Sequence, residues 1–393
     1  LHGRGDKVTD LHFIDQRANK NWQFKGHLDD GIVLHPFGRQ CIGYKSAGEA
    51  DVLEAIEHVL ANYEVDRDRI ALMGFSMGGA GAWHLGAHYA DKWAVVHAGA
   101  GFVDVQRYQK LGPDRMPPDL EQRLWGLYDV PAYARNLLNV PVVAYSGEVD
   151  KQKDAADFME EVLATHGRTL PHIVGKGMGH KYDDDSLAKV AAFIREALAQ
   201  PRERNPDSIH FQTRTLRYHR YAWLEVTALR EHWRDTRVDA EFTQKSTLRI
   251  QTHNARALRV HRPLPADCAI HIDGNSLTLP DAQPVTDLHR TEEGAWKLGS
   301  SPTPTPRKAP GLQGPIDDAF LSPFLVVTPS GKSSDPKLDE WVAFELAHLK
   351  TRWRALFRGD LRTIPSAQLT PELAAQHNLI LFGTPESNDA ILH

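Results

Sequence analysis

A glycine-flanked serine between an apolar strand and a helix is the feature that most constrains this chain. The sequence Gly74-Phe75-Ser76-Met77-Gly78 fits the pattern Gly-x-Ser-x-Gly, and Gly79 follows it. Residues 69–74 predict a strand and residues 80–89 predict a helix. A serine in a tight strand-to-helix turn presents its hydroxyl above the sheet, and the flanking glycines let strand and helix pack closely. The motif therefore predicts Ser76 as a nucleophile. The alternative is a tight glycine turn with an unreactive serine.

The first 200 residues alternate short apolar runs with amphipathic stretches. Alternation at this spacing predicts a parallel sheet covered by helices on both faces, which is an α/β fold. The expected strands are 31–35, 69–74, 94–99, 140–146 and 170–174, and the expected helices are 50–63, 80–89, 154–166 and 186–198.

A serine hydroxyl needs a base, and a histidine stands where this fold would supply one. His180 ends the glycine-rich segment Gly177-Met178-Gly179-His180, after the last expected strand and before the last expected helix. A loop at that place can reach over the sheet toward Ser76. The chain has 21 histidines, so a surface loop histidine is the alternative.

The histidine in turn needs an orienting carboxylate. Gly147-Glu148-Val149-Asp150 follows the strand 140–146, and we expect Asp150 to take this role, with Glu148 as the competitor. The order Ser76, Asp150, His180 along the chain is that of the α/β-hydrolases.

An oxyanion hole needs two backbone donors. The residue after the nucleophile, Met77, is expected to give one N–H group, and the loop 1–6 to give the other through Arg4 or Gly5. Arg4-Gly5-Asp6 also spells an adhesion tripeptide, but the loop explains these residues without it.

These motifs resemble the α/β-hydrolases of the prolyl oligopeptidase-like and esterase group. The resemblance rests on His2-Gly3-Arg4-Gly5, Gly74 to Gly79, Gly147 to Asp150 and Gly179-His180. The whole chain is similar to large bacterial serine peptidases of the prolyl oligopeptidase family, in which segments like 311–320 and 378–383 follow the hydrolase domain. The resemblance implies acyl transfer through an acyl-enzyme on an ester or peptide bond, without a cofactor, and export from the cytoplasm. Nothing in the chain indicates the β-propeller that precedes the hydrolase domain of prolyl oligopeptidase proper.

An insertion at 101–139 separates two of the expected strands. Such an insertion can cover the active site and shape the substrate pocket, and Trp125 and Tyr128 are the expected contacts. An ordinary packed excursion is the alternative.

The pattern changes near Pro201. Strands dominate residues 205–298, residues 299–315 are rich in Pro, Ser, Gly and Thr, and residues 316–393 are α/β again. We therefore expect a hydrolase domain at 1–200, a small mostly-β module, a linker and a partial α/β segment. Leu1-His2-Gly3 is typical of a strand end entering a loop, and a new apolar segment starts at the C-terminus. The chain is thus expected to be a fragment without its first strands.

The amino-acid composition restricts the kinds of partner that we expect the chain to bind. A formal net charge of −5 argues against a protein that coats nucleic acid. Two cysteines exclude a disulfide scaffold, and no run of 18 apolar residues predicts a membrane-spanning helix. The expected partner is a small ester or peptide substrate, and the oligomeric state is open.

Other patterns in the sequence lie outside these motifs. His84 and His88 have the spacing of zinc ligands on a helix, but the sequence offers no third ligand nearby, so no metal site is expected. Asp183 to Asp185 are typical of a helix cap.

A second function remains open, in which the β module makes the chain a binding or assembly protein. The Trp and Tyr residues of 218–233 suit either a carbohydrate-facing strand or a core.

Overall fold

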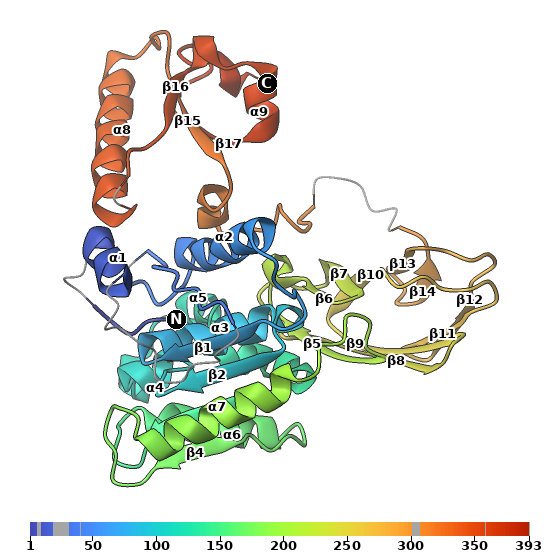
Figure 1. Cartoon of the computed structure of the whole chain (residues 1–393). Helices are drawn as coiled ribbons and strands as arrows, with labels where there is room; N and C mark the ends of the chain where they lie inside the picture. Colours follow the sequence, from blue (N-terminus) through green and yellow to red (C-terminus); the bar gives the residue numbers. More distant parts are fainter. Residues whose placement is uncertain (6–8, 19–30, 40, 301–306, 358, 393) are drawn as a thin grey trace. The chain divides into compact units, whose positions relative to one another are not determined.

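The computed structural model describes residues 1–5, 9–18, 31–39, 41–300, 307–357 and 359–392. The chain divides into two compact units, Leu1–Gln313 and Gly314–His393. The first unit contains a parallel sheet and two further β-sheets, and the second contains a small parallel sheet (Figure 1).

The first sheet has the strand order β1-β2-β3-β4, and all its pairs are parallel. Its strands are β1 Ala71–Phe75, β2 Val95–Gly99, β3 Val142–Gly147 and β4 His172–Gly175. The helices of this part are α1 Asp10–Ala18, α2 Ala47–Asn62, α3 Met77–His88, α4 Val105–Gln109, α5 Asp119–Trp125, α6 Lys153–Ala164 and α7 Asp184–Leu198. The expected α/β architecture is confirmed.

Neighbouring strand residues point to opposite faces of this sheet, as the two-residue period of a strand requires. Val95 and Tyr145 pack with Val190 and Ile194 of α7. Val96 and Ala144 belong to the larger core, which also holds buried side chains of α3 and α6. The continuous apolar runs of β2 and β3 therefore arise because helices cover both faces.

The turn between β1 and α3 depends on glycines that let backbones touch. A Cβ atom on Gly74 would lie 1.9 Å from the carbonyl oxygen of Gly78, and one on Gly79 would lie 2.1 Å from that of Gly99. No side-chain movement relieves either contact, because the opposing atoms belong to the backbone. The glycines of the motif are thus explained by close packing of strand and helix.

Substituting Gly74 by alanine is expected to lower the free energy of unfolding by about 3 kcal/mol, since the backbone must shift to admit the methyl group. Chemical denaturation measures this change. Gly179→Ala is the matched control, because a Cβ atom there has nothing within 4 Å and it should shift stability by about 0.5 kcal/mol or less. Equal stability of the Gly74→Ala variant and the wild type would contradict the packing argument.

The β segment, residues 208–298, forms two five-stranded sheets, β14-β13-β10-β7-β6 and β12-β11-β9-β8-β5. All their pairs are antiparallel except β9 with β11. The strands are β5 Ser208–Thr213, β6 Arg220–Tyr221, β7 Leu224–Leu229, β8 Thr236–Gln244, β9 Thr247–His253, β10 Ala255–Val260, β11 Ala269–Ile272, β12 Asn275–Thr278, β13 Thr286–Arg290 and β14 Trp296–Leu298.

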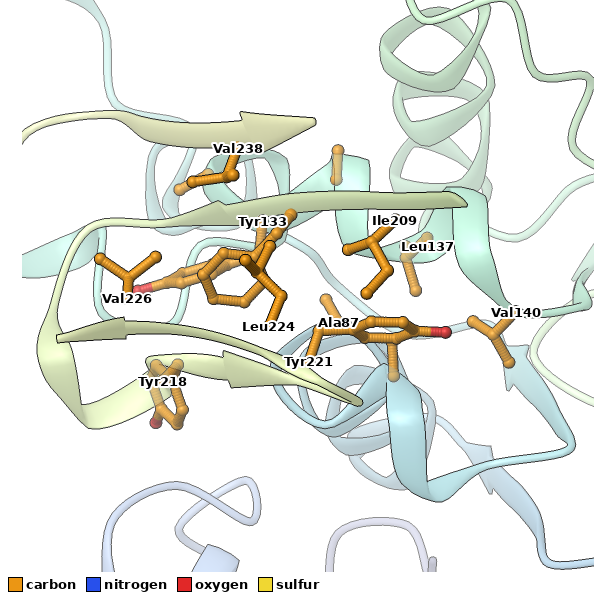
Figure 2. Close-up of a cluster of buried hydrophobic side chains, with 14 of the residues drawn as sticks. Ala87, Tyr133, Leu137, Val140, Ile209, Tyr218, Tyr221, Leu224, Val226 and Val238 are labelled. Atoms are coloured by element: carbon orange, nitrogen blue, oxygen red, sulfur yellow. The ribbon is translucent and has the colours of Figure 1, made fainter. Parts of the chain in front are cut away.

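The β segment shares its core with the α/β part. Figure 2 shows Ala87 of α3, Tyr133 and Leu137 of the 3-10 helix η3 (Val130–Asn139), and Ile209 and Leu224 of the β segment in one apolar cluster. Buried Asn136 adds polar bonds across this seam. Its amide donates to the carbonyl oxygens of Ala87 (2.8 Å) and Gln212 (3.0 Å), and its oxygen accepts from Gln212 N (2.7 Å).

Core packing accounts for the aromatic residues at the start of the β segment. Tyr218, Tyr221 and Trp223 are all buried in the shared core. These three side chains are therefore not displayed on a carbohydrate-facing surface.

The second unit holds the parallel sheet β16-β15-β17. Its elements are β15 Phe324–Thr328, α8 Pro336–Phe357, β16 Thr363–Pro365, α9 Pro371–Gln376 and β17 Asn378–Leu381. The predicted linker 299–315 includes residues 301–306, which lie outside the described residues. The domain boundaries expected from the sequence stay predictions.

One expected strand is wrong. Residues 31–35 form no strand, and the side chains of Ile32 and Val33 are exposed. An apolar run becomes a strand only beside a partner, and Leu1 N donates to Met73 O of β1 instead, at 2.5 Å. None of the described helices is both long enough and apolar enough to cross a membrane.

Candidate active site

Ser76 lies in the turn between the carboxyl end of β1 and the first residue of α3. Its backbone has φ 61° and ψ −122°, a conformation that is costly for a residue other than glycine. Two hydrogen bonds hold the turn, from Ser76 N to Gly99 O at 2.9 Å and from Ala80 N to Ser76 O at 3.0 Å. The fold thus imposes a strained backbone on Ser76, at the place that the sequence motif predicts.

Asp150 and His180 come together from the loops that follow β3 and β4. His180 Nδ1 lies 2.8 Å from Asp150 Oδ2. The Asp150 side chain is 5 % exposed and that of His180 is 42 % exposed, so the carboxylate is sheltered while the ring reaches solvent. Asp150 Oδ1 accepts a second bond from Gln152 N at 3.0 Å. With Nδ1 engaged by the carboxylate, the second ring nitrogen, Nε2, is the one left for a reacting group.

A glycine makes the approach of these two loops possible. A Cβ atom on Gly147 would lie 2.1 Å from Gly179 O, so the loop that carries His180 rests directly on the end of β3. Val149 N donates to Met178 O at 3.0 Å and closes the contact.

Glu148, the competing carboxylate, has a different partner. Its Oε2 accepts from Gly177 N at 2.7 Å, so it binds the backbone of the His180 loop and not the ring. The geometry therefore favours Asp150 over Glu148 as the partner of His180.

His180 lies close to the serine turn, because its ring packs against the ring of Phe75. The ring centroids of Phe75 and His180 are 4.9 Å apart, and those of Phe75 and Tyr182 are 4.8 Å apart. Phe75 immediately precedes Ser76. The hydroxyl of Ser76 and the ring of His180, both within the described part of the chain, are not joined by a hydrogen bond.

The N-terminal loop lies against Ser76 as well. A Cβ atom on Gly3 would lie 3.5 Å from Ser76 Cβ and 3.9 Å from its Oγ. Buried Tyr44 fixes this loop, since its hydroxyl accepts from His2 N (2.6 Å) and donates to His2 O (3.1 Å).

The three residues predicted to give the oxyanion donors, Met77, Arg4 and Gly5, stay predictions. Met77 is the first residue of α3, where a backbone N–H has no partner within the helix. Gly5 N donates to Cys41 Sγ at 3.3 Å, which engages that group. Arg4 and Gly5 both stay predictions for the second donor.

Tyr128 and Trp125 lie in the insertion 101–139, Trp125 as the last residue of α5. Tyr128 lines a cavity of about 150 Å³ with Lys45, His84 and Asp129, among others. Burial, with the charge of Asp104 adding to it, raises the pKa of Asp129 to about 7. No described contact joins Trp125 or Tyr128 to Ser76, Asp150 or His180, and their role as substrate contacts stays a prediction.

Sequence reasoning missed Gly3, Phe75 and Tyr182 as neighbours of the site. Tyr182 stacks on Tyr145 at 4.2 Å, and its hydroxyl lies 2.7 Å from His97 Nε2. The signal for Phe75 was its place inside the serine motif. Tyr182 follows His180 by two residues but gave no pattern of its own.

Comparisons with known proteins give one family match, in the α/β part of the chain. Residues 43–200 match the prolyl oligopeptidase family. A comparison with curated proteins gives no match.

Several solved structures are similar to part of the chain. A puromycin-hydrolysing peptidase of Mycobacterium tuberculosis is 19 % identical over 42 % of this chain and 27 % of its own, with a TM-score of 0.35. An S-formylglutathione hydrolase of Staphylococcus aureus is 18 % identical over 39 % of this chain and 63 % of its own (TM-score 0.30). A ferulic acid esterase is 21 % identical over 37 % and 59 % (TM-score 0.30). The chain thus spans less than two thirds of the length of each of these proteins.

The resemblance expected from the sequence motifs is confirmed for the matched residues. A parallel sheet covered on both faces, with the serine turn between its first strand and the following helix, is the architecture of an α/β-hydrolase. This architecture agrees with the match of residues 43–200 to the prolyl oligopeptidase family.

Proposed function

We propose that the chain is a serine hydrolase that acts on an ester or peptide bond through an acyl-enzyme on Ser76. The observation that carries the proposal is the pairing of Asp150 with His180 at 2.8 Å, beside the strained turn of Ser76. A buried carboxylate on Nδ1 orients the ring and leaves Nε2 to take the serine proton.

The proposed reaction has two halves. In the first, His180 Nε2 accepts the Ser76 proton while Oγ attacks the substrate carbonyl, and the N–H groups of Met77 and of Arg4 or Gly5 hold the developing oxyanion. The tetrahedral intermediate then collapses, and His180 returns the proton to the leaving alcohol or amine. In the second half, His180 takes a proton from water while the water oxygen attacks the acyl carbonyl. The second tetrahedral intermediate then collapses, the bond from the acyl carbon to Ser76 Oγ breaks, and His180 returns the proton to Oγ as the acid leaves.

A fluorophosphonate probe tests the proposal, because it bonds covalently to an activated serine. We expect one label per chain in the wild type and none in Ser76→Ala. Ser276→Ala, which removes an exposed serine of β12, is the matched control and should label like the wild type. A folded wild-type chain that takes no label would contradict the proposal. A panel of aryl esters and prolyl peptides then separates esterase from peptidase activity.

A further inference from the structure

A buried cluster of ionisable side chains lies between α2, α3 and the 3-10 helix η4 (Leu216–Tyr218) of the β segment. It contains Glu49 of α2 and, from α3, His84 and His88. These three residues are 1 %, 2 % and 3 % exposed. Burying a carboxylate and two imidazoles together is costly unless each polar atom has a partner.

Two imidazole nitrogens of this cluster have no hydrogen-bond partner. His84 Nε2 lies 3.0 Å from Gly43 O, so this nitrogen carries the hydrogen and Nδ1 keeps a lone pair. That lone pair faces Glu49 Oε2 at 3.9 Å, and Nδ1 has no hydrogen-bond partner. His88 Nδ1 lies 3.3 Å from the same oxygen, and His88 Nε2 has no hydrogen-bond partner. Two acceptors therefore face each other in the core with no donor or cation between them.

We propose that Glu49, His84 and His88 form a buried binding site for a divalent transition-metal ion of the zinc type. One carboxylate and two imidazoles are a donor set that zinc accepts, and tetrahedral ligands at 2.0–2.2 Å lie about 3.3–3.5 Å apart. The 3.3 Å separation of Glu49 Oε2 and His88 Nδ1 has this length. Glu49 Oε2 and His84 Nδ1 are 3.9 Å apart, and a small side-chain movement would bring them to this length. One ligand atom from each of the three residues lies within 4.8 Å of the others.

The surroundings of one of the two imidazoles match those of protein metal ligands, in which the second ring nitrogen of a histidine commonly donates to a backbone carbonyl. His84 makes this bond to Gly43 O. The other carboxylate oxygen, Glu49 Oε1, accepts from Tyr89 (2.9 Å) and Arg217 (3.3 Å), and Tyr218 donates to the same carboxylate at 3.0–3.1 Å. Arg217 thus compensates Oε1, while Oε2 points toward both imidazoles.

The ion would have a structural consequence for the whole first unit. It would tie α2 to α3, the helix that begins at the Ser76 turn. His84, one of the three proposed ligands, also lines the 150 Å³ cavity. Binding of the ion to the folded state alone would raise the melting temperature.

Cobalt titration of the EDTA-treated chain tests the site, with a weak chelator present to suppress surface binding. We expect one tightly bound Co²⁺ per chain, with the intense visible absorption of tetrahedral coordination. His84→Ala should weaken the affinity about 100-fold or more. His172→Ala is the matched control, because Asp157, Glu160 and His172 form the other potential ligand group in the described residues, and it should bind like the wild type.

A second measurement keeps the test decisive if His84→Ala does not fold. Zn²⁺ should raise the melting temperature of the wild type and not that of Glu49→Gln, in which the amide keeps the shape of the carboxylate. A folded wild type that binds less than one tight ion overturns the proposal, as does binding that His172→Ala abolishes. The cluster would then be a hydrogen-bonded core that holds only protons or water.

Discussion

Replacing His180 with alanine should lower kcat by about 10⁴- to 10⁶-fold and change KM only a few-fold. The ring moves the proton in both halves of the proposed reaction. Loss of the base therefore removes an interaction made in the transition state. Steady-state kinetics on an aryl ester that the wild type hydrolyses measures the effect.

Two controls separate loss of the base from loss of structure. His271→Ala removes an exposed histidine of β11 and should keep wild-type kcat. The His180→Ala variant should unfold at nearly the wild-type denaturant concentration, since the ring it loses is 42 % exposed. A folded His180→Ala variant with more than a tenth of wild-type kcat would show that another group acts as the base.

The strands and helices of residues 69–99 and 140–198 could be predicted because local patterns determine them, whereas α4 and α5 in the insertion 101–139 were not predicted. Each parallel strand there is a short, mostly apolar run, and α6 and α7 each show a stripe of apolar side chains. Residues at the carboxyl ends of parallel strands meet along one edge of the sheet. The sequence alone therefore predicts that Asp150 and His180 lie near each other, and the structure has them 2.8 Å apart.

Contacts between segments far apart in the chain could not be predicted in this way. Periodicity marks Ile209 and Leu224 as apolar, but it does not say that they pack against α3 and η3 (Figure 2). Glu49 stands 35 positions before His84, and no local pattern links a helix residue to a histidine pair on the next helix. The same limit explains residues 31–35, whose apolar run has no strand partner in the described residues.

The second large effect on kcat is expected in the loop that follows β3, which holds two carboxylates, Asp150 and Glu148. Asp150→Asn should lower kcat by about 10⁴-fold, because an amide that donates to Nδ1 holds the ring in the tautomer that cannot accept the serine proton. Glu148→Gln is the matched variant in the same loop. Its amide oxygen can still accept from Gly177 N, so kcat should stay within about tenfold of the wild type.

The pair of variants discriminates better than either alone, because both remove one carboxylate charge from the same loop. A purely electrostatic effect of the loop on His180 would lower kcat similarly in both. A specific bond to Nδ1 predicts a difference of about a thousandfold between them, measured with the same ester substrate at saturation. If Glu148→Gln loses the larger share of activity, Glu148 must replace Gly177 N with His180 as its partner during catalysis, and the assignment of Asp150 is wrong.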